Sequence, residues 1–310
     1  MRIFITGATG FVGGYVLEEL KKHGHETVVL VRTGSKHKLP QDFNGEIVSG
    51  DCFNFDFPFN CDAVIHLIGI LRQFRWKGIT FEKHQFQAAK SVADKAMKKG
   101  VKRFLLMSAN GVKPVGTPYQ STKYLAEQYI KSKNFNWTIF RPSILFGDPS
   151  QPSGDVGKPE FCTMLYRQMI KPPIPAPMFC PGLKLNKGGM FKLQPIHVKD
   201  VAKGIVASLA NEKSIGKIYH VGGKDELTWR EIIDIISKAA KKKKWKVPVP
   251  AVKMKVLGTL FGWLPFFPIT RHQITMLMEG NVCDASEFLT DFEIAPRAFS
   301  SEQLVYVSKS

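Results

Sequence analysis

The sequence predicts an α/β fold in which a doubly wound parallel sheet carries a smaller C-terminal lobe. Short β-rich runs alternate with helical patterns through the first half of the chain, which is typical of right-handed βαβ units. Several of these runs, such as residues 64–68, are almost wholly apolar, as expected for strands that helices cover on both faces. After Asp148 the composition changes to Pro, Gly, Ser and Lys, which marks the start of a different region.

The first half contains six expected strands and three expected helices, the first of which begins at Phe11 within a glycine-rich turn. Apolar residues recur at helical spacing through Thr80–Lys99, and the third helix opens near Tyr119. The strands are placed at Ile3–Thr6, Thr27–Val31, Glu46–Ser49, Ala63–Ile68, Arg103–Met107 and Trp137–Arg141.

The second half divides into a return to the sheet and a separate lobe. Residues 149–193 are expected to be rich in loops, and the tail beyond Ala298 is expected to be partly disordered because it has little pattern. Between and after them we expect a helix at Asp200–Ala210, a strand at Lys217–Val221 and a helix at Thr228–Lys243 that Thr228 caps. Residues 1–148 and 194–222 would then form the sheet domain, and residues 149–193 and 223–310 the lobe.

Composition limits the class of protein. The chain has 310 residues, 44% of them hydrophobic, so it can bury a core without a metal or a disulfide. Its five cysteines, at positions 52, 61, 162, 180 and 283, have neither disulfide-framework nor zinc-site spacing, and we expect reduced thiols in a cytoplasmic protein with no metal site. We find no signal-peptide pattern at Met1 and no apolar stretch of the length that a membrane-spanning helix needs.

The net charge of +18 is shared equally by residues 1–150 and 151–310, but the excess of the second half lies in one segment. Between Asp234 and Glu279 there is no acidic residue, whereas Lys238–Lys255 carries eight lysines and is followed by a run rich in Trp and Phe. Lys238–Ile269 is therefore a candidate for binding an anionic membrane surface, which would place the protein at the inner face of the membrane. The alternative is that the apolar run packs into the lobe and the lysines are solvated. We find no nucleic-acid-binding motif, so no nucleic-acid partner is expected.

A glycine-rich turn joins the first strand to the first helix. A diphosphate needs bare backbone N–H groups at the start of a helix, and side chains at the first two glycines would block its approach, whereas the third glycine allows close packing of helix and strand. Its position between a strand and a helix predicts a dinucleotide site that includes Gly7, Thr9, Gly10, Phe11, Val12 and Gly13.

Arg32, at the end of the second strand, bears on the choice of dinucleotide. Sites that select NAD usually have an acidic residue there for the ribose hydroxyls, but here the first acid is Asp42. Arg32 could form a bidentate contact with a 2′-phosphate, with help from Lys36 or Lys38. NADP(H) is therefore favoured over NAD(H), although a solvated base at a strand end is the alternative.

Three residues suggest chemistry on an oxygen-bearing carbon. Tyr119 and Lys123 are four residues apart, so they lie on one face of a helix and can share a ligand. An adjacent ammonium favours the phenolate of Tyr119, which could then exchange a proton with a carbonyl or an alcohol. Ser108, at the carboxyl end of a neighbouring strand, could hydrogen-bond the same substrate oxygen.

These motifs resemble the short-chain dehydrogenase/reductase family in its extended or atypical branch, which implies a Rossmann-type fold. The resemblance rests on residues 6–13, 50–51, 66–69 and 141–147 together with the three residues above. It implies that Asp51 contacts adenine, that Leu67 and Gly69 line the cofactor, that Lys123 holds the nicotinamide ribose, and that Pro142, Ser143 and Ile144 border the nicotinamide. His84 departs from the asparagine that many relatives carry there.

Residues 263–273 and Asn281–Val282 are similar to a subgroup that contains the Rossmann-type accessory subunit of mitochondrial NADH:ubiquinone oxidoreductase and its bacterial relatives. We therefore expect an oxidoreductase that prefers NADP(H) and acts through Tyr119, Lys123 and Ser108 on a small-molecule carbonyl or alcohol, which could be amphipathic. Two alternatives stay open. One is a non-catalytic accessory subunit of a respiratory membrane complex, and the other is a nucleotide-sugar epimerase or dehydratase.

Overall fold

The computed structural model describes residues 1–152, 158–182, 184–264 and 269–309. Its centre is a seven-stranded sheet with the order β11-β6-β5-β4-β1-β2-β3, and every neighbouring pair in it is parallel. The chain reverses its winding direction between β1 and β4, which is where ligands bind in open α/β sheets. The strands are β1 (Arg2–Thr6), β2 (Glu26–Val31), β3 (Glu46–Ser49), β4 (Ala63–His66), β5 (Arg103–Met107), β6 (Asn136–Pro142) and β11 (Lys217–Val221). The predicted doubly wound α/β fold is confirmed.

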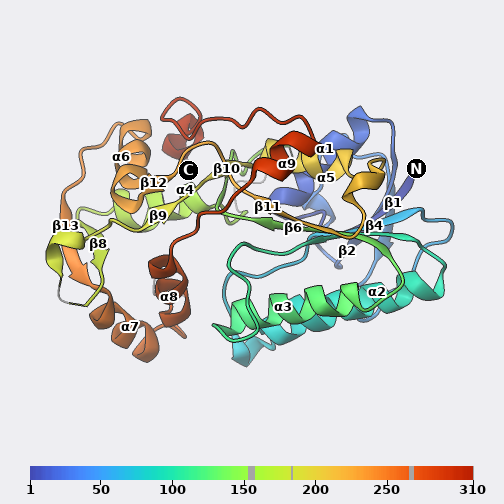
Figure 1. Ribbon diagram of the computed structural model, residues 1–310, viewed down its shortest axis with the longest axis horizontal. Coiled ribbons are helices and arrows are strands. Elements are labelled where there is room, and N and C mark those ends of the chain that lie inside the picture. Colours follow the sequence, from blue (N-terminus) through green and yellow to red (C-terminus); the bar gives the residue numbers. More distant parts are fainter. Residues whose placement is uncertain (153–157, 183, 265–268, 310) are drawn as a thin grey trace.

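Helices cover both faces of this sheet, as Figure 1 shows. One face carries α1 (Phe11–Lys22), α5 (Val198–Ala207) and α9 (Ser286–Asp291), and the other carries α2 (Ala88–Lys98) and α3 (Pro118–Lys131). A π-helical stretch, Glu82–Gln87, leads into α2, so the helix expected at Thr80–Lys99 has two parts. All four residues of β4 are buried, which explains why its sequence is nearly continuous in apolar residues.

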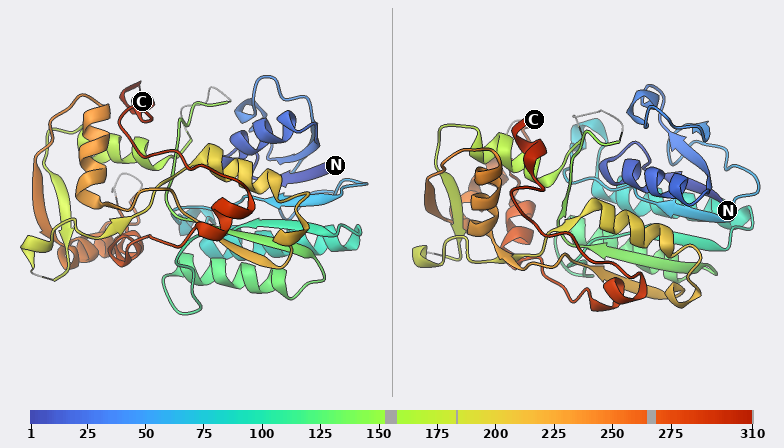
Figure 2. Two further views of the ribbon diagram at one scale, coloured as in Figure 1. Left: turned by 45° about the horizontal axis from the view of Figure 1, so that its top comes forward. Right: turned by 90° about the horizontal axis from the view of Figure 1, so that it is seen from above.

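The smaller lobe lies beside the carboxyl ends of the strands (Figures 1 and 2). It has its own hydrophobic core around Trp229, Phe179 and Ile233. Its elements are α4 (Phe161–Leu165), β8 (Ala176–Cys180), β9 (Lys192–Leu193), β12 (Leu227–Thr228), α6 (Trp229–Ala239), β13 (Lys246–Pro250), α7 (Ala251–Leu260) and α8 (Arg271–Glu279). The parallel pair β7 (Leu145–Phe146) and β10 (Ile196–His197) connects it to the sheet domain.

Short helical turns complete the described chain. They are the 3-10 turns Lys36–Lys38, Arg75–Lys77, Leu185–Lys187, Glu212–Ser214 and Val305–Lys309 and the π-helical turn Tyr166–Ile170. Across the described ranges, no helix combines the length and the apolar character needed to cross a bilayer. The same ranges contain no group of three or more His, Cys, Asp or Glu side chains that could hold a metal ion.

Two expectations about the lobe need correction. Residues 149–193 contain α4, β8 and β9 as well as loops, because apolar residues such as Cys162 and Phe179 contribute to the lobe core. The lobe does not include all of residues 223–310, since Phe288 and Phe292 of the α9 region pack into the core of the sheet domain. Within the expected lobe, positions 153–157, 183, 265–268 and 310 lie outside the described residues.

The tail beyond Ala298 is ordered against the lobe, which corrects the expectation of partial disorder. The rings of Phe299 and Phe146 meet edge to face with centroids 4.9 Å apart. Leu304 and Val307 are fully buried, and the Tyr306 hydroxyl accepts a hydrogen bond from the Gly147 amide at 3.2 Å. The few apolar residues of this tail therefore close one side of the lobe core.

Candidate active site

The glycine turn after β1 has a backbone that requires glycine. Gly7 has a φ of +84°, and a Cβ there would lie 3.0 Å from the carbonyl carbon of Leu67, at the end of β4. The Gly10 amide donates a 3.0 Å hydrogen bond to the Gly7 carbonyl, which closes the turn. A Cβ on Gly13 would lie 2.3 Å from the Gly7 oxygen, so the third glycine allows helix α1 to pack directly on the turn, as the spacing predicts.

The start of helix α1 is suited to bind an anion. Gly10 is its exposed N-cap residue and, within the described residues, no side chain caps the helix. The first turn holds no acidic residue that would neutralise the positive end of the helix dipole. Thr9, Phe11 and Val12 are partly buried around this end. These residues fit the diphosphate of a dinucleotide.

Arg32 and Asp51 lie at the carboxyl ends of β2 and β3, next along the sheet edge. Both side chains are exposed. Hydrogen bonds from the Phe53 and Asn54 amides, at 2.8 and 3.0 Å, hold the Asp51 carboxylate and lower its pKa, with a smaller contribution from the charges of Lys83 and Arg32. The predicted adenosine-binding pair is thus brought together on one side of the glycine turn.

Lys123 reaches the sheet edge from helix α3. Its ammonium donates hydrogen bonds to the Met107 carbonyl at 2.8 Å and the Ile68 carbonyl at 3.4 Å, at or just beyond the ends of β5 and β4. The side chain is buried, and desolvation lowers its pKa to about 8, against the opposing charge of Glu127. A Cβ on Gly69 would lie 3.3 Å from Nζ, so glycine at this position leaves room beside the amine.

Tyr119 lies one turn before Lys123, in the first turn of α3. Thr117 caps this helix, and Thr117 and Gln120 form a capping box that fixes where it begins. The Tyr119 ring meets Phe81 edge to face at 5.5 Å, and burial raises the pKa of its phenol to about 12. Burial therefore keeps the phenol protonated at neutral pH, contrary to the expectation that the Lys123 ammonium favours the phenolate, and the phenol can act as a proton donor.

The third predicted catalytic residue, Ser108, is not directed at the same place. It is buried, and its hydroxyl donates a 2.5 Å hydrogen bond to the carboxylate of Glu127. Glu127 is fully buried and also accepts two hydrogen bonds from Arg141, from Nε at 2.9 Å and Nη2 at 2.5 Å. The structure thus places the Ser108 hydroxyl in an interior network that joins β5, α3 and β6.

Residues 142–144 follow β6 and connect the sheet to the lobe. The Asn110 amide donates a 2.8 Å hydrogen bond to the Pro142 carbonyl, and Ser143 donates through its hydroxyl to the carbonyl of Gln194. The Ile144 carbonyl accepts a hydrogen bond from the Ile196 amide at 2.8 Å. This segment therefore lies at the carboxyl edge of the sheet, with Ser143 and Ile144 bonded to the returning chain, and its role beside the nicotinamide stays a prediction.

Two buried polar residues beside the site were missed in the sequence. Gln85, in the π-helical stretch, donates to the Ile70 carbonyl at 3.1 Å and accepts from the Thr122 hydroxyl at 2.8 Å. It ties the loop after β4 to helix α3. A signal was present for Gln85, which is a polar residue at helical spacing on a face that is otherwise apolar, whereas the buried face of α3 that carries Glu127 also holds Gln120 and Lys123. His84, by contrast, is only partly buried and bonds the Thr80 carbonyl.

The lobe contacts the sheet domain close to Tyr119. Gln120 donates to the Glu279 carboxylate at 2.8 Å, at the end of α8. On the other side of the site, Arg72 donates to the carbonyls of Gly262 and Leu264 at 2.7 and 2.6 Å. The end of α8 and the residues that follow α7 are therefore held against the domain that carries Tyr119.

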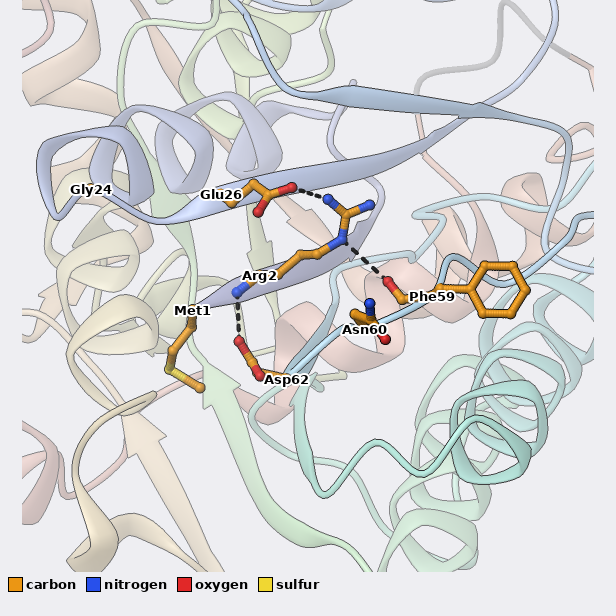
Figure 3. Close-up of a pocket in the computed structure, with 7 residues that line it drawn as sticks. All are labelled: Met1, Arg2, Gly24, Glu26, Phe59, Asn60 and Asp62. Atoms are coloured by element: carbon orange, nitrogen blue, oxygen red, sulfur yellow. Dashed lines mark hydrogen bonds and ion pairs between the residues drawn. The ribbon is translucent and has the colours of Figure 1, made fainter.

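A hollow at the opposite edge of the sheet is not part of this site. Figure 3 shows its lining residues at the amino ends of β1, β2 and β4, namely Met1, Arg2, Gly24, Glu26, Phe59, Asn60 and Asp62. The Arg2 guanidinium bonds Glu26 and the Phe59 carbonyl, and the Arg2 amide bonds Asp62 at 2.7 Å. Ligands of open α/β sheets bind at the carboxyl edge instead.

Comparison with known proteins agrees with this geometry. The profile of the NAD dependent epimerase/dehydratase family matches residues 3–222. The chain is 26% identical to the mitochondrial NADH dehydrogenase (ubiquinone) 1 alpha subcomplex subunit 9 of Arabidopsis thaliana, covering 93% of this chain and 70% of that protein. It is 27% identical to the ceramide reductase of Caulobacter vibrioides over 47% of this chain and 46% of that protein.

A solved structure shows the same fold. It is UDP-glucuronic acid 4-epimerase from Bacillus cereus in complex with UDP-glucuronic acid and NAD. The TM-score is 0.70 at 19% identity, covering all of this chain and 99% of the other. Together with the profile match over most of the chain, the glycine turn and the α3 residues, this confirms the resemblance predicted from the motifs. The chain belongs to the NAD dependent epimerase/dehydratase family, within the extended short-chain dehydrogenases/reductases.

Proposed function

We propose that the protein is an oxidoreductase that uses NADP(H) to reduce or oxidise an amphipathic carbonyl or alcohol substrate. The observation that carries the proposal is the pairing of Tyr119 and Lys123 one turn apart on α3, with the Lys123 ammonium anchored at the carboxyl ends of β4 and β5. The relative named as a ceramide reductase supports a reduction and a lipid-like substrate.

The chain's own groups supply binding and proton transfer. The amides at the start of α1 would hold the diphosphate, and the remaining N–H of Lys123 would bond a ribose hydroxyl or the Tyr119 oxygen. When bound, the reduced nicotinamide would provide the hydride. In the reductive direction the Tyr119 hydroxyl gives its proton to the substrate oxygen, and the nearby ammonium stabilises the phenolate that remains. The new C–H and O–H bonds convert the carbonyl into an alcohol.

Ser108 has a positioning role in this proposal. Its hydroxyl hydrogen is engaged by Glu127, so the serine would act on helix α3 and not donate to the substrate oxygen. The substrate oxygen would then depend on Tyr119 for its hydrogen bond.

The test is substitution of Tyr119. We expect Tyr119→Phe to bind NADPH as tightly as the wild-type protein but to turn over long-chain ketones, including keto forms of ceramide, about 10²–10⁴-fold more slowly, because the proton donor is lost. NADPH consumption and binding are measured separately. The matched control is Tyr129→Phe on the same helix, where the hydroxyl bonds Asp94 away from the site. Equal turnover by Tyr119→Phe and the wild-type protein would contradict the proposal.

Preference for NADP(H) rests on Arg32, which is exposed at the end of β2 where an acid would select NAD. We expect Arg32→Ser to weaken NADPH binding by about 10-fold or more, since a charged hydrogen bond to phosphate is worth roughly 1.5–3 kcal/mol. NADH binding should change little. Calorimetric titration of both nucleotides checks this, with the exposed Lys98→Ser as a control. If Arg32→Ser weakens the binding of NADPH and NADH equally, Arg32 does not recognise the 2′-phosphate.

A second candidate function is that of a non-catalytic subunit that keeps the nucleotide as a structural element. The name of the Arabidopsis relative and the engagement of Ser108 by Glu127 favour it. Under this alternative the protein would co-purify with respiratory membrane subunits from detergent extracts, and Tyr119→Phe would leave that assembly intact. Recovery of free protein that turns over a ketone would count against it.

A nucleotide-sugar epimerase or dehydratase is the third candidate, favoured by the family profile and the epimerase fold match. Such an enzyme keeps its cofactor bound and shows no net redox change. Mass spectrometry of the purified protein distinguishes it from a reductase. Retained NAD together with interconversion of UDP-sugars would support the epimerase, whereas freely exchanging NADPH supports the reductase.

A further inference from the structure

Helix α7 turns an apolar row of side chains to the outside. Val252, Val256 and Leu260 follow one another at intervals of four residues and are 58%, 54% and 58% exposed. Phe261 and Trp263 continue the row, and Trp263 is 65% exposed. We call these five residues the apolar ridge. A contiguous exposed row of this kind marks an interaction surface, because single exposed apolar residues need no explanation but aligned ones do.

The packing of α7 shows that the ridge cannot simply turn inward. The buried residues of the helix are Ala251 and Gly258. A Cβ on Gly258 would lie 2.7 Å from the Arg271 amide nitrogen, so the inner side of α7 sits directly on the start of α8. The alternative that the apolar run packs into the lobe is thus borne out for Ile269, which is buried in the lobe core, and not for the exposed residues of the ridge. Residues 265–268 of that run lie outside the described part of the chain.

The turn between α6 and β13 contains exposed lysines, and it lies at the outer edge of the lobe at the opposite end of β13 from α7 (Figure 1). Lys244 donates to the carbonyls of Ile170 and Pro172, and Lys246 pairs with Asp234, so these two are engaged within the lobe. Lys241–Lys243 are exposed, and so is Trp245 at 82%. We call Lys241–Lys243 the lysine turn.

We propose that the apolar ridge and the lysine turn form a docking surface for an anionic lipid bilayer. Lysines beside Trp and aliphatic side chains match a negatively charged headgroup layer above hydrocarbon. The sequence holds no acid between Asp234 and Glu279, so a second copy of the chain would bring lysines against lysines in a symmetric contact. The charge pattern therefore favours the bilayer over self-association.

Docking would also bring the candidate active site close to the membrane. The importance of this for catalysis rests on the proposed function. Gly262, within the stretch that ends the ridge, accepts a hydrogen bond from Arg72. Gln73, the next residue, accepts from the Phe81 amide at 3.1 Å, and Phe81 packs on Tyr119. The ridge is thus connected through one short loop to the residue that would contact an amphipathic substrate.

Vesicle sedimentation with the full chain tests the surface without any turnover. Two vesicle types are used, phosphatidylcholine alone and an equal mixture of phosphatidylcholine with phosphatidylglycerol. We expect the wild-type protein to sediment with the mixed vesicles and to remain in solution with phosphatidylcholine alone. Sedimentation should weaken as salt is added, because the lysines act through screened charge.

Two variants separate the charged and apolar parts. Lys241→Glu/Lys242→Glu/Lys243→Glu should lose binding by about 10²-fold or more, given about fivefold for each lysine near an anionic leaflet. Val256→Ser/Leu260→Ser/Trp263→Ser should also lose binding although its charge is unchanged. All six side chains are exposed, so the fold should persist, and circular dichroism checks this. The matched control reverses three exposed lysines of the sheet domain, Lys98, Lys102 and Lys131, and should keep binding.

The outcomes that overturn the proposal are distinct. If the wild-type protein fails to sediment with mixed vesicles, the bilayer is not the occupant, and an acidic protein surface would take its place. Equal losses in the control and in the lysine-turn variant would mean that net charge alone drives binding. Because NADPH binding and turnover are measured separately, failure of docking leaves the proposed function standing, and failure of turnover leaves docking standing.

Discussion

At the scale of single residues, Lys123 shows how burial in the site changes the pKa of a side chain. The ammonium is buried and bonds two backbone carbonyls, and desolvation lowers its pKa from 10.5 to about 8. Below about pH 8, Lys123 is charged in the folded protein, and the burial of this charge lowers the free energy of unfolding. Between about pH 8 and 10.5 the folded state releases the proton first, so this contribution to the free energy of unfolding increases with pH.

We predict that Lys123→Met abolishes turnover but raises the free energy of unfolding at pH 7. The lowered pKa means that burying the ammonium costs the folded state roughly 3 kcal/mol at pH 7. The substitution removes this cost but also removes two hydrogen bonds that stabilise the fold by about 1 kcal/mol each. The free energy of unfolding should therefore rise by about 1 kcal/mol. Urea unfolding measures it. The exposed Lys131→Met on the same helix should change stability by less than about 0.5 kcal/mol. If Lys123→Met markedly destabilises the protein, the claim that the buried ammonium lowers the free energy of unfolding is wrong.

Residue positions were predictable where backbone geometry decides them, and side-chain directions were not. The glycine turn could be placed from sequence because Gly7 and Gly13 face steric limits that glycine alone satisfies. Ser108 was placed correctly at the end of its strand, but its hydroxyl turns to Glu127, since a side chain just beyond a strand can face either side of the sheet. Spacing alone does not distinguish these directions.

At the scale of elements, helix α3 is held in place on either side of the segment that carries Tyr119 and Lys123. The Thr117 and Gln120 capping box sets its start, and the buried pair of Glu127 with Arg141 ties its third turn to β6. Tyr119 and Lys123 lie between these two anchors. Their position relative to the sheet therefore depends on an interior network in which Glu127 bonds Ser108 and Arg141.

Breaking that network should cost far more stability than breaking a surface pair. We predict that Glu127→Gln lowers the free energy of unfolding by about 3–5 kcal/mol, because Arg141 loses a buried bidentate partner. Lys22→Met, which breaks the exposed pair with Glu18 at 2.8 Å, should cost less than about 1 kcal/mol. Chemical unfolding of both variants checks the difference. Similar losses in the two would mean that the interior pair does not anchor α3.

Elements with strong local signals were predictable, and those built by tertiary packing were not. Thr228 caps α6 with Glu231 as the sequence indicates, because a capping box is a local interaction. Helix α7 was missed because Gly258 weakens its helical pattern, and its contact with the start of α8 holds it in place. Helix α8 is an exception, because the capping box of Thr270 and Gln273 is a local signal that was overlooked. The π-helical stretch that carries Gln85 has no sequence signature that we could use.

At the scale of the whole molecule, the chain crosses repeatedly between the sheet domain and the lobe. Residues 194–222 return to the sheet, the α9 region returns again, and the tail ends on the lobe. The second return was missed because Phe288 and Phe292 fill a space defined by β11 and α5, elements far away in sequence. Packing between elements that are far apart in sequence produces no hydrophobic periodicity that could be recognised in a short segment.

The ordered tail yields a prediction at this scale. Removing residues 299–310 would uncover Phe146 and delete the buried side chains of Phe299, Leu304 and Val307. Each such side chain contributes roughly 1.5–3 kcal/mol when buried, which together approaches the roughly 5–15 kcal/mol that typically holds a domain folded. We expect the shortened chain to melt far lower or to aggregate. A chain that ends at Val307 should melt like the wild type, and equal melting of both shortened chains would contradict the packing of the tail.

The measurement that tests the central claim most directly is a crystal structure of the protein with NADPH. The account predicts a diphosphate on the amides that follow Gly10 and a nicotinamide that lies between Lys123 and the Tyr119 hydroxyl. A nucleotide bound with its nicotinamide remote from Tyr119, or no nucleotide at a saturating concentration, would contradict the assignment of the site.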